Sequence, residues 1–69
     1  MARETTVEMA ARHVAEQAAR IRKQIQLTRK LARGGHSTKR AEDFLVEMER
    51  TFEDMQTHLE VLLRQQNSN

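Results

Sequence analysis

Apolar and small residues recur along the first half of the chain at alternating steps of four and three residues. This spacing keeps one stripe of side chains on the same side of an α-helix and is typical of a coiled-coil seam. The pattern follows Thr5 and Glu8, which are spaced as in a capping box. It predicts a first helix over residues 6–33. The predicted seam positions are Val7, Ala11, Val14, Ala18, Ile21, Ile25, Thr28 and Ala32.

The second half repeats the alternation with bulkier residues and predicts a second helix over residues 38–65. Phe44, Thr51, His58 and Leu63 widen its apolar side beyond what one facing helix would cover. The wide stripe therefore favours packing against a second copy of the hairpin. The seam positions are Ala41, Leu45, Met48, Phe52, Met55, Leu59 and Leu62.

Gly34 and Gly35 separate the two periodic segments, and we expect a turn over residues 34–37. Either glycine can take the left-handed conformation that closes a helix, and Ser37 or Thr38 can cap the next one. A helix running straight through both glycines would lose about 1 kcal/mol at each. We therefore expect residues 1–69 to form one all-α antiparallel two-helix hairpin, in which facing residues have numbers that sum to about 70. Residues 1–4 and 65–69 carry no periodic pattern and are expected to fray.

A lone hairpin of 69 residues has little to stabilise it. Below roughly 70–80 residues one core rarely supplies more than about 3–5 kcal/mol, and a chain without cysteine has no disulfide to add. We therefore expect the hairpin to dimerise into a four-helix bundle. The core and dimer positions are expected at Val14, Ala18, Ile21, Ile25, Leu45, Met48, Phe52, Met55, Leu59 and Leu62.

The absence of cysteine fits a reducing compartment, and the charged N-terminal residues Arg3, Glu4, Glu8 and Arg12 interrupt any signal-peptide core. No apolar run approaches the roughly 20 residues that a membrane-spanning helix needs. We expect a cytoplasmic protein that does not associate with membranes.

Charge is divided between the two predicted helices. Residues 1–33 hold eight basic and three acidic residues, whereas residues 41–69 hold two basic and seven acidic ones. The simplest interpretation is ion pairing across the antiparallel seam, which would disfavour wrong registers. The alternative starts from the window 20–40, which contains eight basic residues and no acid. In that case the exposed side chains near the turn bind another macromolecule, such as a protein with an acidic patch. The candidate partner-binding residues are Arg22, Lys23, Arg29, Lys30 and Arg40.

Nucleic acid is a second candidate partner for the same basic end, because phosphate contacts need clustered Lys and Arg. The architecture would be similar to that of Rop, an RNA-binding plasmid regulator, although no motif is shared and the analogy is one of fold only. The chain has no Tyr or Trp, and its two Phe residues are expected on the apolar face, so base stacking has no evident platform.

His13 and His58 are expected at the same level of the hairpin, with Glu16 and Asp54 one turn away from them. Two imidazoles and two carboxylates could hold a divalent metal in a helical bundle. The repeated Glu-x-x-His signature of carboxylate-bridged metal sites is missing, so we expect a solvated His13 paired with Glu16 and a half-buried His58, with no metal.

No catalytic constellation is recognisable. The chain has no Cys, Ser37 and Ser68 have no base arranged beside them, and the Gly34-Gly35 pair lacks the Lys-Ser/Thr of a phosphate-binding loop. We expect a protein that is not an enzyme and that uses neither a cofactor nor a small-molecule substrate.

One stretch of the chain resembles a known group of proteins. It contains His13-Val14-Ala15, Arg20-Ile21, Gln24, Leu31, Gly35-His36-Ser37-Thr38, Ala41-Glu42 and Leu45. Over residues 11–63 this order is similar to that of short uncharacterised proteins common in α-proteobacteria. The resemblance implies a bacterial cytoplasmic helical hairpin and carries over no activity and no functional residue.

Overall fold

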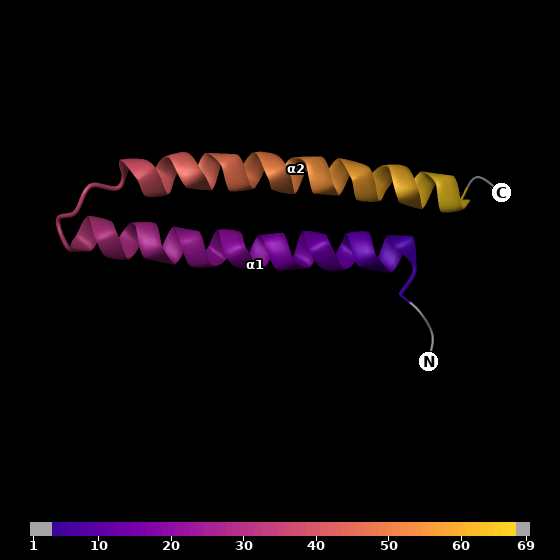
Figure 1. Ribbon diagram of the computed structural model, residues 1–69, viewed down its shortest axis with the longest axis horizontal. Helices are drawn as coiled ribbons and strands as arrows, with labels where there is room; N and C mark the ends of the chain where they lie inside the picture. Colours follow the sequence, from indigo (N-terminus) through magenta and orange to yellow (C-terminus); the bar gives the residue numbers. More distant parts are fainter. Residues whose placement is uncertain (1–3, 68–69) are drawn as a thin grey trace.

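The computed structural model describes residues 4–67, which form two antiparallel α-helices joined by a short turn (Figure 1). Helix α1 spans Thr6–Arg33 and helix α2 spans Lys39–Asn67. The all-α hairpin expected from the hydrophobic pattern is confirmed. Helix α2 continues through Gln65–Asn67, where fraying was expected. The predicted fraying of residues 1–3 and 68–69 lies outside the described residues.

Helix α1 begins at the predicted capping box. The backbone amide of Glu8 donates to Thr5 Oγ1 over 3.1 Å, and the Thr5 amide donates to Glu8 Oε1 over 3.3 Å. The two bonds satisfy amide groups that an uncapped helix start would leave without partners.

Helix α1 ends in a Schellman motif. The amide of His36 donates to the Leu31 carbonyl, and the amide of Gly35 donates to the Ala32 carbonyl. Gly35 has φ +75°, so it is the glycine in the left-handed region, while Gly34 stays at φ −82°. Thr38 then precedes α2, and its hydroxyl donates to Glu42 Oε1 over 2.8 Å. The turn therefore needs a glycine at position 35 for conformational reasons.

The stripe of α1 that faces α2 differs from the predicted seam at every second position. Ala10 and Gln17 are buried and Gln24 and Leu31 are half-buried, whereas the predicted seam residues Ala11 and Ala32 are exposed. The predicted and observed stripes share Val7, Val14, Ile21 and Thr28, all half-buried. Between the shared residues, the observed seam contains the residue three places after each of them. The predicted seam contained the residue four places after each. The predicted core residues Ala18 and Ile25 are left half-buried at its edge.

Two glutamines explain this shift. Gln17 Nε2 donates to the Met48 carbonyl over 3.0 Å, and Gln24 Nε2 donates to the Ala41 carbonyl over 3.2 Å. An amide that reaches a backbone carbonyl of the facing helix can be buried at little cost. Hydrophobicity favoured Ala18 and Ile25 over these glutamines, and in the structure Ala18 and Ile25 are half-buried beside the seam.

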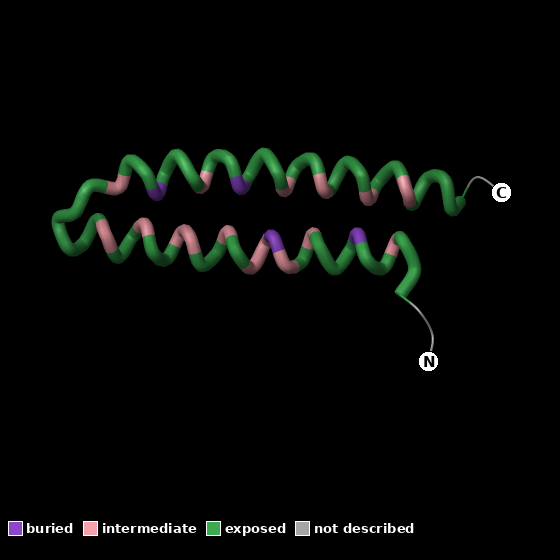
Figure 2. Tube along the Cα trace, in the orientation of Figure 1, coloured by how far each residue is buried: buried purple, intermediate pink, exposed green. Residues whose placement is uncertain are grey.

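The seam of α2 follows the predicted positions (Figure 2). Ala41 and Met48 are buried, and the others are half-buried, namely Leu45, Phe52, Met55, Leu59 and Leu62. Even Met48, the most buried apolar residue, keeps 8% of its surface exposed. A two-helix layer therefore leaves its own core incompletely covered.

Candidate interaction surfaces

The expected ion pairs between the basic and acidic helices are not formed within residues 4–67. The three ion pairs there are Arg12 with Glu4, Arg12 with Glu16, and Lys39 with Asp43, and none joins α1 to α2. Electrostatic pairing across the seam, the simplest interpretation of the charge pattern, is therefore wrong for this hairpin.

The positions beside the seam explain this absence. In a coiled coil, residues that are seven apart occupy the same place relative to the seam, so they form a row along the helix. On one side, which we call the Ala18 face, the α1 row next to the seam is Ala11, Ala18, Ile25 and Ala32, and the α2 row is Glu42, Glu49, Gln56 and Leu63. The acidic residues of this face are thus opposite small or apolar ones.

The other side of the hairpin, which we call the Phe44 face, comprises four rows. Next to the seam are His13, Arg20 and Leu27 of α1 and Phe44, Thr51 and His58 of α2. Farther out are Met9, Glu16, Lys23 and Lys30 of α1 and Arg40, Glu47, Asp54 and Val61 of α2. Only one basic residue of α1, Arg20, adjoins the seam here, so most of its charge points away from α2.

The candidate partner-binding residues all lie exposed in the turn half of the molecule, as expected for a contact surface. They are Arg22, Lys23, Arg29, Lys30 and Arg40. None of these side chains makes an ion pair or hydrogen bond with another residue of the described range 4–67. Lys23, Lys30 and Arg40 belong to the Phe44 face, while Arg22 and Arg29 lie on the Ala18 side of α1.

Charge is also divided along the length of the hairpin. The turn half, residues 20–50, contains nine basic and four acidic residues. The open half, residues 4–19 and 51–67, contains two basic and six acidic residues. Within residues 4–67 the folded hairpin therefore has a positive end at the turn and a negative end where α1 begins and α2 ends (Figure 1).

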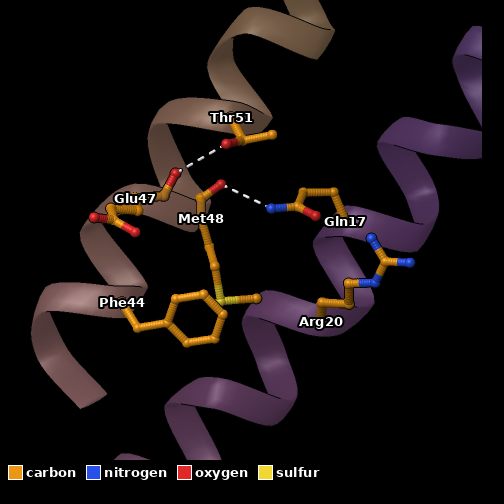
Figure 3. A pocket seen from close by; sticks show the side chains of 6 residues that line it. All are labelled: Gln17, Arg20, Phe44, Glu47, Met48 and Thr51. Carbon is orange, nitrogen blue, oxygen red and sulfur yellow. Dashed lines mark hydrogen bonds between the residues drawn. The ribbon is translucent and has the colours of Figure 1, made fainter. Parts of the chain in front are cut away.

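A hollow in the Phe44 face lies between the two helices near mid-length (Figure 3). Its walls carry Arg20 from α1 and the ring of Phe44 from α2, with Met48 between them. Phe44 is 52% exposed, although it was expected to contribute to the apolar side of α2. The remaining lining residues are Gln17, Glu47 and Thr51.

A second hollow adjoins the turn. Leu27 and Leu31 supply apolar surface, and Lys30, Arg33 and His36 supply basic groups around it. Gly34 also lines this hollow. Both hollows thus open on the Phe44 face, and hydrophobic spacing alone did not predict either, because each combines residues from outside the seam.

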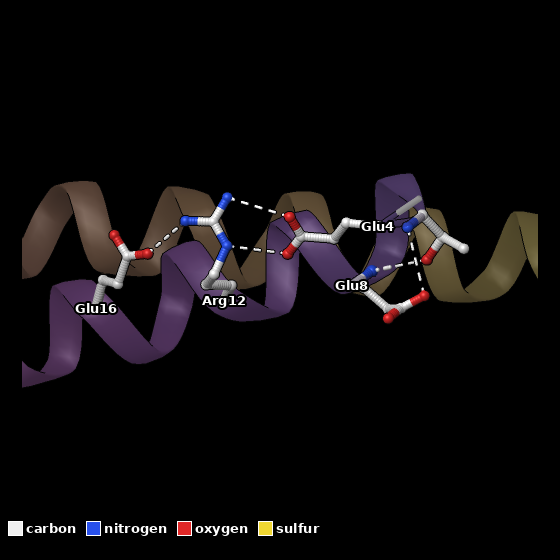
Figure 4. A network of polar contacts seen from close by, with 5 residues as sticks. Glu4, Glu8, Arg12 and Glu16 are labelled. Atoms are coloured by element: carbon white, nitrogen blue, oxygen red, sulfur yellow. Dashed lines mark hydrogen bonds and ion pairs between the residues drawn. The ribbon is translucent and has the colours of Figure 1, made fainter. Parts of the chain in front are cut away.

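The open half carries a compact polar network (Figure 4). Arg12 Nε donates to Glu4 Oε1 over 2.9 Å, and Arg12 Nη1 donates to Glu16 Oε1 over 2.6 Å. The hydrogen bond from Arg12 lowers the pKa of the Glu4 carboxyl, and the two carboxylates raise the pKa of Arg12. Arg12 therefore has carboxylate partners within its own hairpin, unlike the candidate partner-binding residues near the turn.

The histidines do not gather a metal-binding set in the described part of the chain. His13 and His58 are both exposed on the Phe44 face. Glu16, the expected neighbour of His13, pairs with Arg12 instead. No group of three His, Asp or Glu side chains lies close enough to hold a metal ion within residues 4–67.

Neither helix contains, within residues 4–67, a stretch long and apolar enough to cross a membrane. No protein-family model, curated protein or solved structure matches this chain.

Proposed function

We propose that this protein is a small non-enzymatic interaction protein, a homodimeric helical hairpin that binds an acidic surface of another protein through the basic side chains near its turn. One observation carries the proposal. The exposed basic residues of the turn half have no acidic partner across the seam, although α2 is rich in acids. Cations left without partners on a folded surface are available to an external one.

The dimer part of the proposal is supported by the surface of the chain. The hairpin exposes 5868 Å². A compact monomer of its 8.1 kDa mass would expose about 4,500 Å². The excess of about 1,400 Å² for one hairpin is more than the roughly 800 Å² that each partner contributes to a standard protein interface.

The proposed partner-binding residues can be tested together. The variant replaces Arg22, Lys23, Arg29, Lys30 and Arg40 by Glu, and the probe is a fluorescent poly-glutamate peptide followed by anisotropy at low salt. We expect the variant to lose at least about 100-fold in affinity, since each reversal replaces attraction by repulsion. The matched control replaces Glu53, Asp54 and Glu60 of the open half by Gln, Asn and Gln and should not weaken binding. Equal affinity of the five-residue variant and the unmodified protein would refute the proposal.

A nucleic acid is the second candidate partner, favoured by the exposed ring of Phe44, which lines the same hollow as Arg20. An aromatic ring next to an arginine can stack on an unpaired base. The same assay with a single-stranded RNA of mixed sequence separates the two candidates. RNA binding that is much tighter than poly-glutamate binding, that falls linearly in log–log plots against salt and that weakens in Phe44→Ala would replace the acidic-protein proposal.

A further inference from the structure

The Phe44 face holds most of the exposed large apolar side chains. Six such residues are exposed within residues 4–67, and four of them belong to this face. Leu27 and Phe44 form one pair in the turn half, and Met9 and Val61 form another in the open half. Val46 and Leu63, the other two, lie on the Ala18 side. The Phe44 face is therefore the better apolar surface for a partner.

We propose that a second copy of this chain covers the Phe44 face, with the turns of the two hairpins at opposite ends of the bundle. This inference rests on the dimer of the proposed function and adds its contact face and orientation. In this arrangement α1 lies against α1 of the second copy and α2 lies against α2. The result is an antiparallel four-helix bundle.

The area of the face suffices for such a contact. The hairpin is a thin plate, with extents of 55 × 26 × 12 Å. A stable interface needs about 800 Å² from each partner, which is little more than half of one broad side. Both hollows of the Phe44 face would receive side chains of the second copy.

The apolar pairs match when one hairpin is turned end for end. Met9 and Leu27 are 18 residues apart in α1, which is about 27 Å at 1.5 Å per residue. Phe44 and Val61 are 17 residues apart in α2, or about 26 Å. With the end-for-end axis at the level of position 18, Met9 of the second copy lies over Leu27, and Phe44 and Val61 of each copy lie in the same interface.

Charge selects this orientation over the alternative. With the turns at the same end, Leu27 would lie over Phe44 of the second copy, so the apolar pairs would match there too. That arrangement, however, places two positive turn halves together and two negative open halves together. With the turns at opposite ends, each half with nine basic and four acidic residues lies beside one with two basic and six acidic residues.

Individual charges fit the same geometry. The midpoint between Met9 and Leu27 is position 18, and Arg20 and Glu16 lie two residues on either side of it. Turning one hairpin end for end therefore places Arg20 beside Glu16 of the second copy. Arg20, which makes no ion pair within residues 4–67 of its own hairpin, then has an acidic neighbour in the other.

Cysteine cross-linking tests the face and the orientation, because the natural chain has no cysteine. The double variant Met9→Cys/Leu27→Cys is treated with a short bismaleimide and followed by denaturing electrophoresis. We expect covalent dimer to form about 100-fold faster than with either single variant, because thiols held together react as if at millimolar concentration. In the single variants the like positions are about 27 Å apart in the proposed dimer.

The matched control is Val46→Cys/Leu63→Cys, which places two exposed thiols at comparable levels on the Ala18 side. Faster linking in this control would overturn the choice of face. A mixture of Leu27→Cys and Phe44→Cys proteins would link only if the turns lie at the same end, and such linking would overturn the orientation. The sedimentation mass of each uncross-linked variant separates these outcomes from a failure of the dimer itself. A dimeric mass with the wrong cross-links refutes only this inference, and a monomeric mass refutes the dimer on which it rests.

Discussion

The turn half and the open half of the hairpin are built from the same two helices, but they treat charge differently. In the open half Arg12 is shared between Glu4 and Glu16, and the start of α1 is closed by its capping box. In the turn half Lys39 pairs with Asp43, while the other basic residues between positions 20 and 40 make no side-chain ion pair within the described range. A charge pattern along a sequence therefore does not by itself say which charges will meet. Whether a charged side chain of α1 can reach one of α2 depends on how close its row lies to the seam.

The two halves should differ most in how far the free energy of unfolding falls when a seam methionine is replaced by alanine. Met48→Ala in the turn half removes the most buried apolar side chain and should lower the free energy of unfolding by about 2–3 kcal/mol. Met55→Ala, one heptad later in the open half, removes a half-buried side chain and should cost about 1 kcal/mol. Urea unfolding followed by circular dichroism at one fixed protein concentration measures both. Equal losses would show that the halves are packed alike.

The two seam glutamines offer a second comparison between the halves. Gln17→Ala should lower stability by about 1–2 kcal/mol, because Gln17 is buried and its bond to the Met48 carbonyl is lost. Gln24→Ala removes a longer bond at a half-buried site and should cost about 0.5–1 kcal/mol. The exposed Gln26→Ala serves as the control. If Gln17→Ala behaved like Gln26→Ala, the observed seam would be contradicted.

Replacing the turn glycine should lower the free energy of unfolding by a smaller amount, about 1 kcal/mol. Gly35→Ala forces a side chain into a positive φ and should destabilise the turn by roughly that amount. Gly35→Asn should cost less, since Asn tolerates the left-handed region. Thermal unfolding of the two variants at matched concentration gives the order. Alanine matching asparagine would mean that the turn is not held at positive φ.

The smallest effect concerns the polar network of the open half. Arg12→Ala should return the pKa of Glu4 upward to its ordinary value, as seen by NMR titration, because the lowering comes mainly from the Arg12 hydrogen bond. A carboxyl whose pKa is lowered on folding adds stability above its unfolded pKa, and that stability is lost as pH falls through the folded value. The contact therefore weakens on acidification. An unchanged Glu4 titration in Arg12→Ala would refute it.

The hydrophobic spacing was enough to predict two helices, the glycine pair predicted the turn, and the spacing of Thr5 and Glu8 predicted the capping box. It could not separate the two seams available in α1, because Val7, Val14, Ile21 and Thr28 belong to both. The choice depended on Gln17 and Gln24 reaching carbonyls of α2, which is a tertiary contact. The candidate basic residues are exposed, as the sequence predicted. That those of α1 make no ion pair with α2 depends on the same shift of the seam. The Phe44 face combines rows of α1 and α2, so the pattern of either helix alone does not define it.

Sedimentation equilibrium of the purified protein shows whether this hairpin is a homodimer. Interference optics are needed because the chain has no Tyr or Trp, and a parallel trace at 260 nm reports any bound nucleic acid. We expect twice the 8.1 kDa chain mass with no co-sedimenting 260 nm signal. A folded species of 8.1 kDa would contradict the dimer. A dimer that carries a 260 nm signal would replace the acidic protein partner with a nucleic acid.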